Sequence, residues 1–254
     1  MNLKRTIGLI AAASYLFLHV PLLVLIVFSF NSSRFTAWEG FSLKWYAAVL
    51  ADERMLEATW NSLIIAFVST IFAAAVGTLA AYGMWKKKAP VLEGSLYVSL
   101  ITPEIVTGTS LLAFFQWLFH YMDVRLGMHT VILAHITFSI AYVVIVVAAR
   151  LKTMDGTLEE AALDLGANHW EAFWRVTLPN LIPGVIAAAL LAFTISFDDY
   201  VITAMVAGID SETLPMVIYG MARKGVSPAV NAISAIIVVG IGVLIVASER
   251  LQHE

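Results

Sequence analysis

Residues 60–84 read WNSLIIAFVSTIFAAAVGTLAAYGM and contain no charged side chain, and the triplet Lys86-Lys87-Lys88 follows almost directly. A helix rises 1.5 Å per residue and crosses the hydrocarbon core of a membrane in about 20 residues, so this stretch is long enough to span it. Runs of the same kind occupy 7–30, 94–119, 130–149, 183–207 and 229–248. The sequence therefore predicts an all-α, polytopic membrane protein with six transmembrane helices.

The overall composition excludes most other classes of protein. The 254 residues are 60% hydrophobic and 13% charged, and the mean hydropathy is +0.86. A soluble domain carries about 25% charged residues, so membrane lipid is the expected surrounding of this chain. A net charge of −3 without a long basic patch argues against nucleic acid as a partner. The absence of cysteine excludes thiol nucleophiles and cysteine metal sites.

The distribution of lysine and arginine indicates the orientation. If both termini are cytoplasmic, the cytoplasmic pieces hold nine of these residues in 54 positions, and the external pieces hold six in 60. Such a bias toward the cytoplasmic side is typical of membrane proteins. No linker or internal repeat divides the chain, so we expect one transmembrane domain over residues 1–254, with an uncleaved first helix.

Three carboxylates lie within the apolar runs. Glu104, Asp198 and Asp199 are the only charged residues among the 140 residues of the six runs. A carboxylate at membrane depth costs on the order of 3 kcal/mol, so it is expected to face a protein interior or a wet cavity. Either these acids line a cation path, or they cap helix breaks, pair with a base of another subunit, or are protonated.

Polar and aromatic neighbours extend the candidate path. Trp45, Tyr46 and Tyr200 could contact a cation, but each could equally belong to an interfacial aromatic belt, which is the favoured interpretation of Trp45 taken by itself. Ser196 could add a hydroxyl to the path or form a helix–helix contact. His19 and His135 also fall within the runs, and we expect both to be structural. The sequence predicts no metal ligand set, no bound cofactor and no catalytic residue in this chain.

The loop 150–182 is the longest segment predicted on the cytoplasmic side. Thr157 with Glu160 predicts a capping box that starts a short helix, and Gly166 is suited to end that helix in a left-handed cap. The small residues of this helix allow close approach to another surface; they are Ala161 and Ala162.

A second short helix is expected after the first. Asn168 with Glu171 predicts its capping box, and Pro179 is expected to stop it. Its aromatic residues are Trp170, Phe173 and Trp174. The loop is then either an amphipathic connector on the lipid surface or a docking surface for a soluble partner. Charged side chains could direct such docking; they are Glu159, Glu160, Asp164 and Arg175.

The loop resembles the EAA loop of ABC-importer permeases. The family pattern is Glu-Ala-Ala, three residues, Gly, nine residues, Ile, one residue, Leu-Pro. The chain matches it with Glu160-Ala161-Ala162, Gly166, Val176 in place of Ile, and Leu178-Pro179. The resemblance implies that this segment is the coupling helix, which seats in a cleft of the partner ATPase.

The resemblance extends over nearly the whole chain to the spermidine/putrescine permease family, the PotC/PotI type. The matching segments are Phe28-Ser29-Phe30-Asn31-Ser32-Ser33, Lys44-Trp45-Tyr46, His135-Ile136-Thr137-Phe138, Ala161–Gly166, Ser196-Phe197-Asp198-Asp199 and Gly225-Val226-Ser227-Pro228. It implies the type I ABC importer permease fold and a subunit of an ATP-driven polyamine importer in the bacterial inner membrane.

The resemblance also implies the partners. These are a second permease subunit, for which the family favours a homologue over a second copy, two cytoplasmic ATPase subunits that use ATP and Mg²⁺, and an external polyamine-binding protein. The loops 31–59 and 208–228 either receive this binding protein or simply cap the helical bundle. The chain has no G-x-x-x-x-G-K-[ST] sequence, so hydrolysis is expected in another polypeptide.

The sequence leaves several rival functions open. An ABC permease for another small cationic or polar solute would share the loop, whereas anionic cargo is disfavoured by three acids and no lysine or arginine in the apolar runs. An ion-coupled secondary transporter would lack the EAA spacing and often shows inverted repeats. A membrane enzyme would need a cluster of nucleophile, base or metal ligands near one interface.

Overall fold

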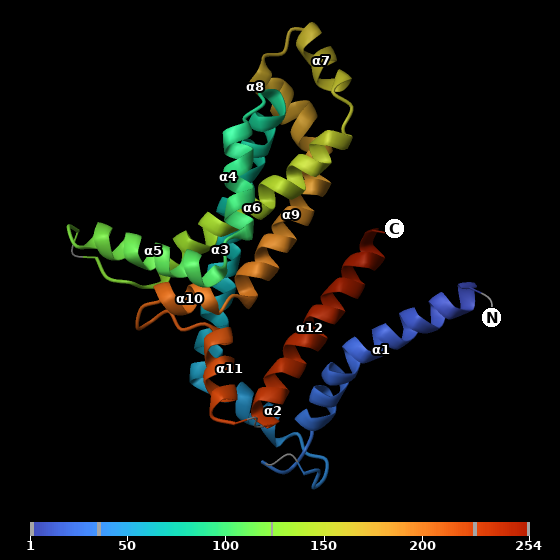
Figure 1. Cartoon of the computed structure of the whole chain (residues 1–254), viewed down its shortest axis with the longest axis vertical. Helices are drawn as coiled ribbons and strands as arrows, with labels where there is room; N and C mark the ends of the chain where they lie inside the picture. The colour runs from blue at the N-terminus through green and yellow to red at the C-terminus, as the bar shows by residue number, and fades with distance from the viewer. Residues whose placement is uncertain (1–2, 35–36, 123, 226–227, 253–254) are drawn as a thin grey trace. The chain divides into compact units, whose positions relative to one another are not determined.

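A computed structural model describes residues 3–34, 37–122, 124–225 and 228–252 (Figure 1). Within these ranges the chain is helical and has no β-strand, only an isolated bridge between Asn31 and Phe41. The helices are α1 Leu3–Ser29, α2 Lys44–Leu50, α3 Glu53–Lys86, α4 Pro90–Ile101, α5 Glu104–Phe119, α6 Met128–Thr153, α7 Thr157–Asp164, α8 His169–Ala172, a π-helix η1 Phe173–Thr177, α9 Leu178–Asp198, α10 Val201–Val206, α11 Leu214–Arg223 and α12 Pro228–Gln252. The predicted all-α class is confirmed.

The chain divides into two compact units. Residues 1–57 and 217–254 form the first unit, and residues 58–216 form the second. In the first unit, α12 contacts both α1 and α2. A buried asparagine, Asn31, orders the turn after α1, because its side-chain oxygen accepts the backbone N–H of Glu39 and its amide donates to the carbonyl of Ala37.

The second unit is a helical bundle with α6 at its centre. In Figure 1, α3, α4 and α9 lie around α6, with which they share one core, and α7 and α8 lie at one end of this bundle. Buried valines of α6 pack against small residues of α3 and α9, which let the helices approach closely. The members of this core are Ala73, Ala81, Val143, Val144, Val147, Leu151, Leu181, Ala188 and Ala192.

Two of the expected transmembrane runs are broken helices. The run 94–119 is α4 and α5, which meet at Thr102-Pro103 with a bend of 109°. Proline removes a backbone donor and pushes the preceding residue into an extended conformation, and Thr102 has φ −63° and ψ 127°. Pro103 therefore interrupts this run, and the interruption is a sharp bend between two helices.

The run 183–207 is broken in the same way. Helix α9 begins upstream of this run and ends at Asp198, Asp199 is extended with φ −67° and ψ 127°, and the short α10 follows. The sequence had indicated a single span. The break leaves the first backbone N–H groups of α10 without carbonyl partners in a preceding turn, so they need another acceptor.

The chain is a multi-pass membrane protein. Among the described residues, four helices are long and apolar enough to cross a membrane: Arg5–Ser29, Glu53–Lys86, Met128–Thr153 and His169–Asp198. The bent pair α4–α5 passes the same test together, and Pro228–Gly240 of α12 is a shorter apolar helix. The count of six crossings stays a prediction.

One close backbone approach in the second unit is expected to require glycine. A Cβ on Gly208 would overlap the carbonyl of Leu126 and lie 2.8 Å from the Cα of Gly127. Because a backbone carbonyl cannot move aside as a flexible side chain can, Gly208→Ala is expected to destabilise the fold by about 1–3 kcal/mol. A lower thermal unfolding midpoint of the detergent-solubilised protein checks this.

The matched control is Gly83→Ala in α3, where an added Cβ meets nothing within 4 Å. This variant should unfold at or above the wild-type midpoint, because alanine is the better helix former. Equal midpoints for the two variants would contradict the packing argument at Gly208.

Candidate functional site

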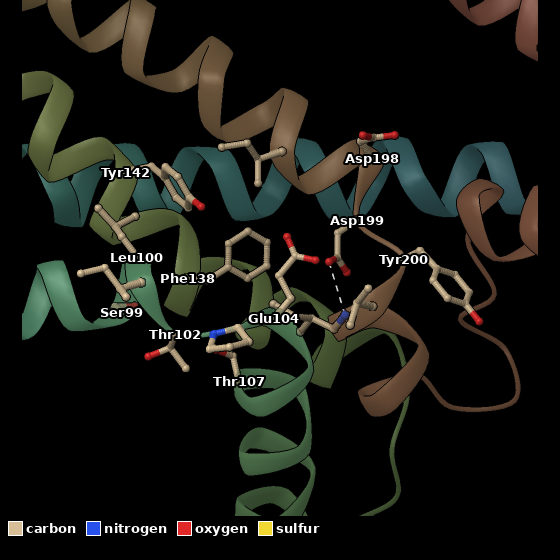
Figure 2. A pocket seen from close by; sticks show the side chains of 15 residues that line it. Ser99, Leu100, Thr102, Glu104, Thr107, Phe138, Tyr142, Asp198, Asp199 and Tyr200 are labelled. Carbon is tan, nitrogen blue, oxygen red and sulfur yellow. Dashed lines mark hydrogen bonds between the residues drawn. The ribbon is translucent and has the colours of Figure 1, made fainter.

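The two helix breaks meet at a pocket of about 600 Å³. Its wall combines the end of α4, the start of α5, one face of α6 and the α9–α10 break (Figure 2). Gly108 permits the contact between α5 and α10, since a Cβ there would lie 3.3 Å from the Cα of Ile202. All three acids of the apolar runs line this pocket; they are Glu104, Asp198 and Asp199.

Asp199 caps the helix break. Its carboxylate accepts the backbone N–H of Thr203 at 2.7 Å and that of Ile202 at 3.3 Å, and the Thr203 hydroxyl donates to it at 2.7 Å. The bond from Ile202 is drawn in Figure 2. The two backbone donors are orphan N–H groups at the start of α10, and the Asp199 side chain is only 5% exposed. Its position therefore fits the capping alternative that the sequence left open.

A buried histidine links four helices behind this cap. His135 of α6 is 1% exposed; its Nδ1 lies 2.6 Å from the Ser196 hydroxyl, and its Nε2 lies 2.9 Å from that of Thr203. The same Nε2 lies 3.5 Å from the carboxylate of Asp199. Ser196 in turn lies 3.0 Å from the hydroxyl of Ser69 on α3. His135 is structural, as the sequence predicted, and Ser196 belongs to this buried network rather than to the pocket wall.

Glu104 and Asp198 have exposed side chains, in contrast to Asp199. Glu104 is the first residue of α5, where the positive end of the helix dipole favours a negative charge. In Figure 2 the carboxylate of Glu104 lies beside that of Asp199, whereas the carboxylate of Asp198 points away from both. Tyr200, the residue before α10, lines the pocket with its ring directed outward.

Two aromatic residues of α6 in the pocket wall were not predicted. Phe138 and Tyr142 line the pocket and lie one helical turn apart on the same face as His135. The i, i+4 spacing of these aromatics was visible in the sequence, but helical spacing alone does not say which face of α6 meets the α4–α5 break.

Trp45 and Tyr46 belong to the first unit and are not among the residues that line this pocket. Trp45 donates its indole N–H to the Asn31 carbonyl at 2.8 Å, and the Tyr46 hydroxyl is hydrogen-bonded to Ser29. Lys44 places its ammonium 4.9 Å from the centre of the Trp45 ring. These contacts give both aromatics a role in ordering the turn after α1.

The loop between α6 and α9 contains the expected two short helices, with one cap predicted wrongly. Helix α7 has Gly156 at its N-cap without a side-chain bond, and the backbone N–H of Thr157 is bound by Asp155 at 3.0 Å. Thr157 and Glu160 therefore form no capping box, because Thr157 is already the first helical residue. Gly166 ends α7 with φ +93°, as predicted.

The second helix keeps its predicted cap but continues past Pro179. Asn168 and Glu171 form the expected capping box of α8. The helix then passes through the π-helix Phe173–Thr177 into α9, with Pro179 in its first turn. Proline is tolerated in the first turn of a helix, and Pro179 lies in the first turn of α9 directly after the π-helix. The prediction that Pro179 stops the helix was wrong.

Glu159 anchors α7, so its predicted part in directing a docking partner was wrong: its side chain is buried and bound within the chain. Tyr82 and Lys86 of α3 donate to its Oε1, each at 2.7 Å, and Thr177 donates to its Oε2 at 2.9 Å. Burial alone would raise the pKa of this carboxyl, which is 3% exposed, but the three donors outweigh burial and hold its pKa below the ordinary value. A helical step of about 100° separates it from Glu160, and only the fold shows which of the two acids faces α3.

Some of the residues matched to the EAA pattern are exposed, and others are half-buried. Glu160, Ala161 and Gly166 are exposed, and Ala162 and Leu178 are half-buried. Large apolar side chains are exposed beside them; they are Leu165 at 90%, Trp170 at 60% and Trp174 at 49%. Exposed apolar groups next to acidic residues form a surface suited to docking a protein partner.

Comparisons with known proteins bear on the whole chain. A family model described as "Binding-protein-dependent transport system inner membrane component" matches residues 73–253. The chain is 39% identical over 246 residues to the spermidine/putrescine transport system permease protein PotC of Escherichia coli (strain K12), which covers 95% of this chain and 92% of that protein. It is 39% identical over 237 residues to the putrescine transport system permease protein PotI of the same strain, with 91% and 84% covered.

A solved structure shares the fold. It is a bacterial ABC transporter involved in the import of the acidic polysaccharide alginate, with a TM-score of 0.67 over 100% of this chain and 98% of that chain. The sequence identity is 15%, so this likeness concerns the architecture alone.

The lowered pKa of Glu159 predicts how stability depends on pH. A carboxyl whose pKa is lower in the folded state stabilises the fold fully above its unfolded pKa, and this contribution is lost as the pH falls through the folded pKa. Glu159→Gln should therefore lower the unfolding midpoint at pH 7, and its deficit relative to wild type should shrink below about pH 4.5. Thermal unfolding in detergent between pH 7 and pH 3.5 measures this.

Glu160→Gln is the matched control, since its carboxyl is exposed on the same helix. It should follow the wild-type course over this pH range. A Glu159→Gln deficit that stays constant from pH 7 to pH 3.5 would contradict a charged, hydrogen-bonded Glu159.

Proposed function

Because the chain belongs to the family of binding-protein-dependent transport system inner membrane components, we propose that it is a permease subunit of an ATP-driven importer for the polyamines spermidine and putrescine. The observation that carries the substrate class is the identity of 39% to two polyamine permeases over more than nine tenths of this chain. The subunit forms part of a membrane path and performs no covalent chemistry.

The chemistry of the pocket supports a cationic substrate. Glu104 and Asp198 keep exposed carboxylates beside a cavity of about 600 Å³, and Phe138 and Tyr142 add aromatic faces. A polyamine is an extended multi-cation with an apolar methylene stem, so it suits carboxylates for its ammonium groups and aromatic rings for its cationic and apolar parts. Asp199 contributes mainly by capping the break that shapes the wall, and Trp45, Tyr46, Tyr200 and Ser196 remain candidate path residues.

The loop between α6 and α9 supports a separate motor. We infer that Glu160, Ala161, Ala162 and Gly166 seat α7 against a cytoplasmic ATPase, with Leu178-Pro179 joining this segment to α9. Two such ATPase subunits bind ATP and Mg²⁺ and drive alternation between outward- and inward-open states. The exposed Leu165, Trp170 and Trp174 supply the apolar area for this docking.

The remaining surfaces support further partners. The apolar window of α1 has none of its residues buried within this chain, so it is available to lipid or to a second permease subunit. A homologous subunit fits the heteromeric arrangement expected for this family. The loops 31–59 and 208–228 would receive an external polyamine-binding protein. With six crossings of a bacterial inner membrane, both termini and the loop 150–182 would lie on the cytoplasmic side.

The pocket acids generate the first transport prediction. In the reconstituted complex, Glu104→Gln combined with Asp198→Asn should reduce uptake of labelled spermidine at least fivefold, because the path loses both exposed carboxylates. The same double variant should lower the unfolding midpoint only slightly, since neither side chain is buried and Glu104 loses only its interaction with the dipole of α5. Uptake by vesicles and thermal unfolding in detergent measure the two effects.

The control is Glu93→Gln, an exposed carboxylate in the first turn of α4, outside the pocket wall. It should transport at the wild-type rate. Asp199→Asn should lower the unfolding midpoint, because its carboxylate binds three donors. Unchanged spermidine uptake in the double variant would remove the acidic path from the proposal.

Glu160 lies on the surface of α7 that we propose docks the ATPase. Glu160→Lys reverses an exposed charge on α7 and should reduce both spermidine uptake and co-purification of the ATPase subunit at least fivefold. Because Glu160 is exposed, the variant chain itself should fold normally. Retention of the ATPase on affinity-purified permease, with uptake measured in parallel, tests this, and normal values for both would exclude Glu160 from the docking surface.

A further inference from the structure

Helix α7 is held to the rest of the second unit by a polar side chain rather than by an apolar face. Glu159 is the one buried residue of α7, whereas Leu158 beside it is 49% exposed. Short amphipathic helices are usually held by a stripe of buried apolar residues. Apolar packing is non-directional, but a bound carboxylate fixes both the position and the rotation of the helix that carries it.

Both oxygens of Glu159 are bound, and the donors come from two elements. Tyr82 and Lys86 lie in the last two turns of α3 and bind Oε1, and Thr177 closes the π-helix and binds Oε2. We call these four side chains the Glu159 clamp. A buried carboxylate is tolerated only with such partners. A shift of α7 on α3 would therefore leave the buried charge of Glu159 without them.

The donors of the clamp are themselves held in place. The ring of Phe173, 2% exposed, lies 4.6 Å from the ring of Tyr82. The ammonium of Lys86 lies 4.6 Å from the centre of the Trp85 ring. Aromatic contacts of this kind restrict the donor rotamers, so little ordering is needed for them to bind Glu159.

Helix α3 carries a second polar junction at its opposite end. Asn61 donates to the carbonyl of Glu212 at 3.0 Å, and Ser62 accepts the backbone N–H of Leu214 at 2.9 Å. The helix between Ser62 and Lys86 is roughly 36 Å long at 1.5 Å per residue. One continuous helix therefore connects the clamp to the segment that precedes α11.

We propose that Glu159 is a positioning residue that fastens α7 to α3, so that movement of the coupling segment is transmitted through α3 to the opposite end of the second unit. This proposal rests on the proposed function, and it adds a route of transmission distinct from the direct chain connections of α7 to α6 and α9. Glu160 then faces the partner ATPase, and Glu159 faces the membrane helices.

The first experiment measures coupling in the complete complex reconstituted in vesicles. Glu159→Gln keeps the shape of the side chain and removes its charge. Spermidine transported per ATP hydrolysed should fall at least threefold while ATP hydrolysis continues, and Tyr82→Phe should give a smaller fall. Glu93→Gln should match the wild-type ratio. A role limited to folding would lower uptake and hydrolysis together at an unchanged ratio, and that result would overturn the proposal.

The second experiment does not depend on the identity of the solute. The chain contains no cysteine, so spin labels can be placed at Asp164→Cys on α7 and Gly83→Cys on α3 without removing native thiols. With intact Glu159, the distance between the labels should be the same in the nucleotide-free and vanadate-trapped complex. In Glu159→Gln, it should change between the two states.

The outcomes separate this proposal from the proposed function. A wild-type complex that hydrolyses ATP but imports no spermidine would refute the substrate assignment, while the label distances still decide the role of Glu159. A label distance that changes with nucleotide in the presence of intact Glu159 would overturn the clamp, whatever solute is carried.

Discussion

The structure depends on one constraint, that backbone polar groups within a membrane must find partners inside the protein. Most of the chain meets it with continuous helices, but α4–α5 and α9–α10 interrupt theirs. At the second interruption, the carboxylate of Asp199 accepts N–H groups that have no acceptor within the helix. His135 is hydrogen-bonded to Ser196 before the break and to Thr203 after it. Because the two breaks lie against each other, the irregular backbone lines a cavity instead of facing lipid. The pocket is thus a direct result of how the chain satisfies its own backbone.

The carboxylates of this chain fall into two physical classes. Asp199 and Glu159 are buried, and each binds three donors, so their charge stabilises one local arrangement. Glu104 and Asp198 are exposed beside the pocket, so their charge remains available to a cation. The sequence grouped the acids by their depth in apolar runs, but the number of donors around each carboxylate distinguishes their roles better. A charged residue in an apolar run is a candidate for the substrate path. Its hydrogen-bond partners then show whether its charge is already bound within the chain.

Features that depend on neighbouring residues were predictable, and those that depend on packing were not. The Gly166 cap and the Asn168–Glu171 capping box each involve residues within one turn, so local chemistry decides them. Pro103 signalled an interruption, but its bend of 109° follows from how α5 packs on α10. The buried position of Glu159 depends on Tyr82, which lies 77 residues away in the chain, so no local pattern could select it over Glu160.

The π-helix Phe173–Thr177 has a consequence for how the chain length can vary. A π turn holds about one residue more than an α turn, and each residue of a helix rotates its successors by about 100°. Removing a single residue here would restore an ordinary α turn and leave α8 and α9 in nearly the same rotational relation, because the wider π turn already absorbs the extra residue. A deletion elsewhere between Gly166 and Leu178-Pro179 has no such turn to absorb it and would rotate α7 and α8 relative to α9. We therefore expect single-residue deletions to be tolerated within Phe173–Thr177 better than in the rest of this stretch.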